Sequence, residues 1–186
     1  MNESAARPRA DARQNHDRLL EVARDALAAN PGVSLNSIAK SAGVGPGTLY
    51  RHFPNREALV LGVYRKEIQQ LVDLAPALIA ERPPMAALRQ WFDRLAHYGR
   101  IKQGLADVLH GAMSDGVLRD TYGPMVGAID QLLRACEASG DIRAGVDAED
   151  VLLLAGFLWR VEPGQTGQAR AERLLDLLID GLRAPA

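Results

Sequence analysis

The sequence has little of what anchors or cross-links many other classes of protein. It is 186 residues long and has one cysteine, Cys136, which excludes an internal disulfide and a zinc site built from cysteines. No apolar run approaches the roughly 20 residues of a membrane-spanning helix, and the polar N-terminus lacks the apolar centre of a signal peptide. We therefore expect a cytoplasmic protein without membrane association, long enough to bury a core of its own.

Strand signals are also scarce. Aromatic residues make up 5% of the chain, and β-branched residues are scattered rather than alternating. Apolar residues recur instead at helical spacing, as in Leu19, Ala23 and Leu27, so the chain is predicted to be all-α. Pro76 is expected to break or kink the fourth helix. The predicted helices cover residues 12–29, 35–41, 46–52, 56–80, 84–102, 105–114, 124–139, 148–162 and 168–183, with a short piece at 115–124.

The formal net charge of -1 conceals an uneven distribution. Residues 1–66 hold ten basic and six acidic side chains, a charge of +4, whereas the remaining 120 residues hold 12 basic and 17 acidic side chains, a charge of -5. A basic end on an acidic remainder suits a polyanionic partner at one end only. Chance variation in composition is the alternative explanation.

Residues 34–53 have the pattern of a helix-turn-helix. Ala39 is small where two short helices approach closely, and Gly43 can adopt the positive φ of a sharp turn. The apolar residues spaced to close a small core are Ile38, Val44 and Leu49. The residues expected on the outside, each with a polar group for a phosphate, are Thr48, Tyr50 and His52.

This region resembles the TetR family of transcriptional regulators. The most specific stretches are Ala42–Val44, Gly47–Phe53 and Asn55–Leu59. The resemblance implies an all-α homodimer, with an N-terminal three-helix DNA-binding domain that contains the helix-turn-helix and a C-terminal helical bundle for ligand binding and dimerisation. It divides the chain into a disordered polar arm (1–11), a DNA-binding domain (12–66) and a regulatory domain (67–186). Two later stretches, 88–109 and 138–151, are similar to one C-terminal subtype of the family.

The resemblance also implies which residues contact a double-stranded DNA operator. They are Ser34, Pro46, Gly47, Thr48, Tyr50, Arg51, His52 and Arg56. Ser34 would bind phosphate at the start of the second helix, and Arg56, where the family usually has lysine, would bind phosphate at the start of the fourth. Arg13 or Arg18 is a further candidate for contact with the DNA backbone.

The recognition helix is unusual in its first residues. Gly45, Pro46 and Gly47 offer no side-chain hydrogen bond to a base edge. Direct readout is therefore expected to be modest, with Pro46 against a thymine methyl group and Arg51 toward guanine or phosphate. DNA shape and half-site spacing would supply the remaining specificity.

Aromatic and methionine side chains on the later helices suit an apolar effector pocket. The residues predicted to line it are Trp91, Leu95, Tyr98, Leu109, Met113, Tyr122, Met125, Ile129 and Phe157. Ordinary core packing is the alternative for each of them. No cofactor or metal is expected, because the four histidines lack metal-ligand spacing and no glycine-rich phosphate loop follows a strand.

The segment Val151–Trp159 is apolar on nearly all sides, so a helix there must be covered on more than one side. The last helix carries an apolar stripe of Leu174, Leu175, Leu178 and Leu182. We predict a homodimer through helices 148–162 and 168–183, two from each chain. A central helix of a monomeric bundle is the alternative.

These patterns together predict a repressor that a small, mostly apolar effector releases from a palindromic operator. Two alternatives remain from the sequence. One is a constitutive DNA-binding protein whose aromatic residues only pack. The other is an all-α enzyme, which is disfavoured because no Ser-His-Asp set, metal motif or cofactor motif is present and no residue is assigned a catalytic role.

Overall fold

The computed structural model describes residues 6–104, 115–162 and 164–184, and the side chains of 15–99, 120–162 and 164–184. It separates into two compact units, and the division along the fourth helix falls between Lys66 and Glu67. We call residues 6–66 the head, and residues 67–103 with 115–184 the body. Each is described by itself.

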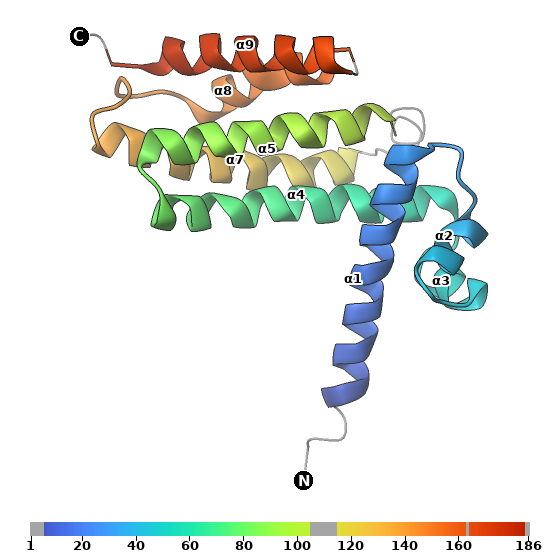
Figure 1. Cartoon of the computed structure of the whole chain (residues 1–186). Coiled ribbons are helices and arrows are strands. Elements are labelled where there is room, and N and C mark those ends of the chain that lie inside the picture. The colour runs from blue at the N-terminus through green and yellow to red at the C-terminus, as the bar shows by residue number, and fades with distance from the viewer. Residues whose placement is uncertain (1–5, 105–114, 163, 185–186) are drawn as a thin grey trace. The chain divides into compact units, whose positions relative to one another are not determined.

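The elements of the structure are labelled in Figure 1. The head contains α1 (Ala6–Ala29), α2 (Leu35–Ser41), α3 (Pro46–His52) and the first part of α4 (Arg56–Glu81). The body contains the rest of α4, α5 (Pro84–Gly104) as far as Gln103, α7 (Asp115–Ala138), α8 (Ala148–Leu154), the 3-10 helix η1 (Ala155–Trp159) and α9 (Gln165–Leu182). The only strand-like feature of the described residues is an isolated bridge between Ile142 and Arg183. The all-α prediction is confirmed.

The head forms because a short turn and a cap fix two short helices against α1 and α4. Ser34 begins α2 by accepting a hydrogen bond at its Oγ from the Ser37 amide, at 3.1 Å. Gly43 has φ +70° in the turn before α3, a conformation that suits glycine. The core of the head consists of Leu19, Leu20, Ala23, Leu27, Ile38, Ala39, Leu49, Phe53, Leu59, Val60 and Val63.

A hydrogen bond and an ion pair join helices of the body. The Trp91 indole of α5 donates to the Leu71 carbonyl of α4 at 2.8 Å, and Arg89 of α5 pairs with Asp176 of α9. The centre of the body is made of large buried side chains, among them Leu71, Leu88, Trp91, Phe92, Leu95, Ile129, Leu132 and Leu175. The body therefore has a hydrophobic core of its own.

Several helix boundaries differ from those predicted. Helix α1 begins at Ala6, so residues 6–11 are helical rather than a disordered arm, since alanine and arginine favour helix and Pro8 lies in the first turn. Residues 1–5 and the predicted helix 105–114 lie outside the described residues.

Two prolines do not end their helices. Pro76 lies within α4 and Pro124 within α7, so the predicted boundary at residues 123–124 is wrong. A proline in a helix frees the carbonyl four residues earlier. Both prolines are exposed, so water can bond those carbonyls and the helices continue.

The predicted single helix 148–162 is also wrong. The α-helix ends at Leu154 and continues as the 3-10 helix η1. Gly156 weakens the α-helix there, and the Trp159 ring packs so closely on α5 that a Cβ at Gly99 would lie 2.9 Å from it. The tighter 3-10 turn thus accompanies the packing of Trp159 on Gly99.

Candidate nucleic-acid interface

Helix α3 divides into one buried side and one exposed side. Leu49 is fully buried in the head, which fixes the rotation of the helix. Gly45, Pro46 and Gly47 at its start are exposed, and the Tyr50 side chain is 45% exposed. Apart from Leu49, α3 therefore has an exposed side that starts at its first residues. In addition, Arg51 and His52 are exposed and Thr48 is half-buried.

Arg51 folds back along its own helix. Its Nε donates to the Gly47 carbonyl and its Nη2 to the Thr48 hydroxyl, both at 3.3 Å. These are long hydrogen bonds at an exposed site, so they are weak. The guanidinium stands over the small residues at the start of α3 and can exchange these partners for a phosphate or a guanine.

His52 belongs to an aromatic cluster that sequence reasoning missed. Its ring meets that of His16 from α1 edge-on, with centroids 5.5 Å apart. His16 also lies 5.3 Å from the Phe53 ring. The pattern around His16 gave no signal, because its partners are 36 and 37 residues away in the chain. This cluster supports the last turn of α3 from the side of α1.

Ser34 and Arg56 both have partners within the head. Ser34 caps α2, and its hydroxyl also forms a 2.8 Å hydrogen bond with the Ser37 hydroxyl. The Arg56 guanidinium is half-buried, with Nη1 donating to the Val33 carbonyl at 2.6 Å and Nη2 to the Pro31 carbonyl. The structure therefore directs Arg56 toward protein carbonyls.

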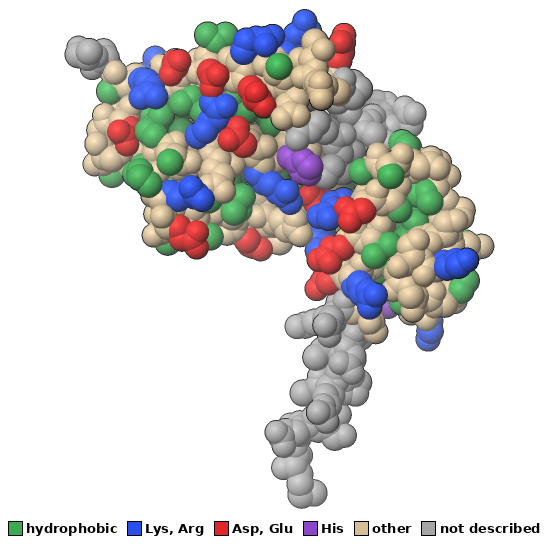
Figure 2. Space-filling view, viewed as in Figure 1, with side chains coloured by type: hydrophobic (Ala, Val, Ile, Leu, Met, Phe, Trp, Pro, Cys, Tyr) green, Lys and Arg blue, Asp and Glu red, His purple; other side chains and the backbone are tan. Residues whose placement is uncertain are grey.

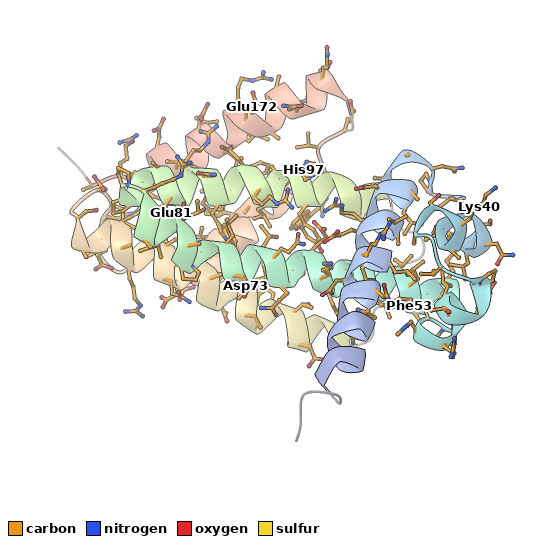
Figure 3. The ribbon with its side chains drawn as sticks, turned by 60° about the horizontal axis from the view of Figure 1, so that its bottom comes forward. Lys40, Phe53, Asp73, Glu81, His97 and Glu172 are labelled. Atoms are coloured by element: carbon orange, nitrogen blue, oxygen red, sulfur yellow. The ribbon has the colours of Figure 1, made fainter. Side chains whose placement is uncertain are left out.

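Some of the basic charge of the head is paired. Lys66 lies 3.2 Å from Glu21 and 3.7 Å from Asp17, and Arg24 pairs with Asp25 at 2.8 Å. Lys40, in contrast, extends outward from the edge of the head (Figure 3). Figure 2 shows basic side chains separated by apolar and neutral ones on the visible face of the head. On this face the basic side chains of the described residues are therefore not gathered in one patch.

The predicted effector-pocket residues are mostly buried in the body. Trp91, Leu95, Tyr98, Met125 and Ile129 are buried, Phe157 is half-buried, and Leu109 and Met113 lie outside the described residues. Tyr122 is 43% exposed, since it lies on the outer side of α7. Tyr98 contacts the Trp159 ring edge-on at 5.7 Å.

A hollow of about 270 Å³ lies elsewhere, between α5 and α9. It is lined by Met85, Ala86, Arg89, Asp176, Ile179, Asp180 and Arg183, none of which was predicted as a pocket residue. Its charges compensate one another, because Arg89 pairs with Asp176 and Asp93, and Arg183 pairs with Asp180 at 3.1 Å. These pairings leave little net charge to recognise an ion.

Three leucines on α8 and α9 stand out among the exposed side chains of the body. Leu153, Leu154 and Leu177 are 77%, 63% and 68% exposed. The predicted stripe on α9 is split, since Leu175 and Leu182 are buried in the body while Leu174 and Leu178 are half-buried. Leu177, which the stripe omitted, is the most exposed leucine of α9.

Metal ligands do not gather among the side chains that the structure describes. Over residues 15–99, 120–162 and 164–184, no three His, Cys, Asp or Glu side chains lie close enough to hold an ion. No helix in the part of the chain that the structure describes is both long and apolar enough to cross a bilayer.

Comparisons with known proteins agree with this architecture. Residues 19–63 match the family described as "Bacterial regulatory proteins, tetR family", and residues 83–184 match "Transcriptional regulator SbtR-like, C-terminal domain". The structure of the TetR transcriptional regulator SCO0520 from Streptomyces coelicolor is 39% identical, with a TM-score of 0.81 over 92% of this chain and 99% of that one. A TetR regulatory protein from Mycobacterium vanbaalenii is 34% identical, with a TM-score of 0.77 over 95% and 99%.

Curated relatives are more distant. The probable acrEF/envCD operon repressor of Escherichia coli K12 is 27% identical over 81% of this chain and 74% of its own. The match to the HTH-type transcriptional regulator SAR0097 of Staphylococcus aureus, 32% identical, covers 44% of each protein, which is less than half of that relative.

A head that holds a helix-turn-helix and a helical body are typical of a helix-turn-helix transcriptional regulator. The chain belongs to the TetR family, and its body is of the SbtR-like C-terminal type. The resemblance read from the sequence is thus confirmed.

Proposed function

We propose that the protein is a repressor that binds a near-palindromic operator as a dimer. The proposal rests on the orientation of α3: Leu49 is buried in the head, so the exposed residues between Gly45 and His52 face outward. Base contacts would come from Pro46 and Arg51. Phosphate and sugar contacts would come from Ser34, Gly47, Thr48, Tyr50 and His52. Repression as the direction of control is supported by the name of the Escherichia coli relative, which is an operon repressor.

Dimerisation through α8, η1 and α9 would place two recognition helices on one duplex. Leu153, Leu154 and Leu177 support this surface, because full burial of a leucine contributes roughly 1.5–3 kcal/mol. A two-fold interface uses the same surface on both subunits, so each of these leucines would be buried once in each subunit. Two heads related in this way would meet half-sites about one helical turn, or a multiple of it, apart.

Release of the operator would follow binding of a small apolar compound in the body. The buried aromatic and aliphatic residues Trp91, Leu95, Met125 and Ile129 support an apolar compound. An effector changes operator affinity only if it binds two conformations of the protein with different affinity, and the coupling is then reciprocal.

The proposal is tested by screening apolar compounds for a rise in melting temperature and then titrating each hit against protein bound to a fluorescent operator. Compounds that stabilise the free protein and raise the operator Kd support it. Transcription in vitro from a promoter with the operator gives the direction of control, with repression expected. Stabilising compounds that leave operator affinity unchanged would favour the constitutive DNA-binding protein, in which these residues only pack.

A further inference from the structure

Arg56 connects the first turn of α4 to the turn between α1 and α2. One guanidinium nitrogen donates to the Val33 carbonyl at 2.6 Å and the other terminal nitrogen donates to the Pro31 carbonyl. We infer that Arg56 is a positioning residue for DNA binding, which holds the α1–α2 turn in place instead of contacting a phosphate. This inference rests on the proposed use of the head to bind DNA.

The bonding pattern requires the shape of a guanidinium. Its planar fork presents N–H groups on separate nitrogens, so it can bond two carbonyls of one turn at the same time. A lysine ammonium is a single compact charge and does not reproduce this fork. The identity of residue 56 as arginine is therefore matched to the pair of carbonyls at 31 and 33.

The turn that Arg56 holds leads directly into α2. Asn30 closes it by accepting hydrogen bonds from the Gly32 amide at its side chain, 2.9 Å, and from the Val33 amide at its carbonyl, 3.0 Å. Ser34, the next residue, caps α2. Helix α2 then packs its buried Ile38 in the core that also holds Leu49 of α3. Movement of the turn would therefore reach the recognition helix through α2.

The position of Arg56 in α4 agrees with a specific contact. A cation in the first turn of a helix is unfavourable, because the helix dipole is positive at that end. The two carbonyl oxygens offset this by presenting partial negative charge to the guanidinium.

The test compares Arg56→Lys and Arg56→Ala with Arg65→Ala, which removes the same charge from an exposed position of α4 in the head. Hydrogen exchange of the free protein is the first readout. We expect amides of residues 32–38 to exchange about tenfold faster in both Arg56 variants and to be unchanged in Arg65→Ala. Unchanged protection in Arg56→Lys and Arg56→Ala would overturn the inference, whether or not the protein binds DNA.

The second readout is the salt dependence of operator affinity. The logarithm of the binding constant falls linearly with the logarithm of the salt concentration, and its slope is about 0.9 for each phosphate that the protein neutralises. We expect both Arg56 variants to lose about 10-fold to 100-fold in affinity with the slope unchanged, as for loss of charge-assisted hydrogen bonds. If Arg56→Ala lowers the slope by about one phosphate and Arg56→Lys restores affinity and slope, Arg56 is a phosphate contact and the inference is wrong. If the wild-type protein binds no DNA, the proposed function fails, and the exchange data still decide the role of Arg56.

Discussion

The ring of Phe53 lies directly against Gly62. A Cβ carbon at position 62 would lie 2.8 Å from Phe53 Cε1 and 3.0 Å from Leu20 Cδ2, closer than such atoms approach. The absence of a side chain at Gly62 therefore lets α4 contact Phe53, the residue that caps the end of α3. Because Phe53 also lies beside His16 of α1, three helices meet around one ring.

Gly62→Ala is expected to lower the free energy of unfolding by about 1–3 kcal/mol, because the added methyl group must displace a buried ring. Operator affinity should fall as well, since Phe53 supports the end of α3. Urea unfolding at fixed protein concentration measures the first effect. Gly127→Ala is the matched control, since Gly127 is an exposed helical glycine with nothing near its Cβ position. This substitution should raise the free energy of unfolding by up to about 1 kcal/mol. Equal stabilisation by both substitutions would show that a methyl group at position 62 does not displace the Phe53 ring.

Arg51→Ala is expected to weaken operator binding unevenly. If Arg51 leaves Gly47 and Thr48 to reach a guanine, its loss should cost about 1–3 kcal/mol and relax specificity at one base pair of each half-site. Anisotropy titrations against duplexes with each base pair changed in turn measure this. Uniform weakening on all duplexes would show that Arg51 contacts only phosphate.

Leu177→Asp is expected to convert the proposed dimer to monomer, because an aspartate at this position would place an unpaired charge in the proposed apolar interface. Light scattering at micromolar concentration should give twice the 20.1 kDa chain mass for the wild type and one chain mass for the variant. Gln168→Glu, an acid added on the opposite side of α9, should remain a dimer. A monomeric wild type would refute the proposed interface.

Cys136 is expected to be nearly inert in the folded protein. Burial, with a further effect from the charge of Asp141, raises the pKa of its thiol from 9.0 to about 11. At pH 8 the folded protein then holds about 100-fold less thiolate than the unfolded chain, and iodoacetamide should react correspondingly slowly. Since the unfolded thiol ionises first, this group also lowers folded-state stability as pH rises from about 9 to 11. Equal alkylation rates in buffer and in denaturant would show that Cys136 is accessible.

The head was predictable because its signals are local. A cap at Ser34, a turn glycine at Gly43 and apolar residues at helical spacing lie within 20 residues, and each acts on its near neighbours. The role of Arg56 was not predictable in this way, because its partners lie 23 and 25 residues earlier. Spacing along the chain does not report such a contact.

The body was less predictable because its helices are decided by packing and exposure. A proline signals a helix end, yet Pro124 continues α7 because it faces solvent. Likewise, apolar spacing shows that a helix has an apolar side, but not whether that side packs in the body or lies on its surface. The stripe predicted on α9 therefore included the buried Leu175 and omitted the exposed Leu177. The predicted DNA contacts and pocket residues remain predictions.

Selection of binding sites from random DNA tests the central claim most directly. The account predicts enrichment of one near-palindrome whose half-sites are centred about one helical turn, or a multiple of it, apart, bound by an even number of chains. Tyr50→Ala, which removes an exposed side chain from α3, should lose affinity for that sequence. Enrichment of no sequence, or of a single half-site bound by one chain, would contradict the account.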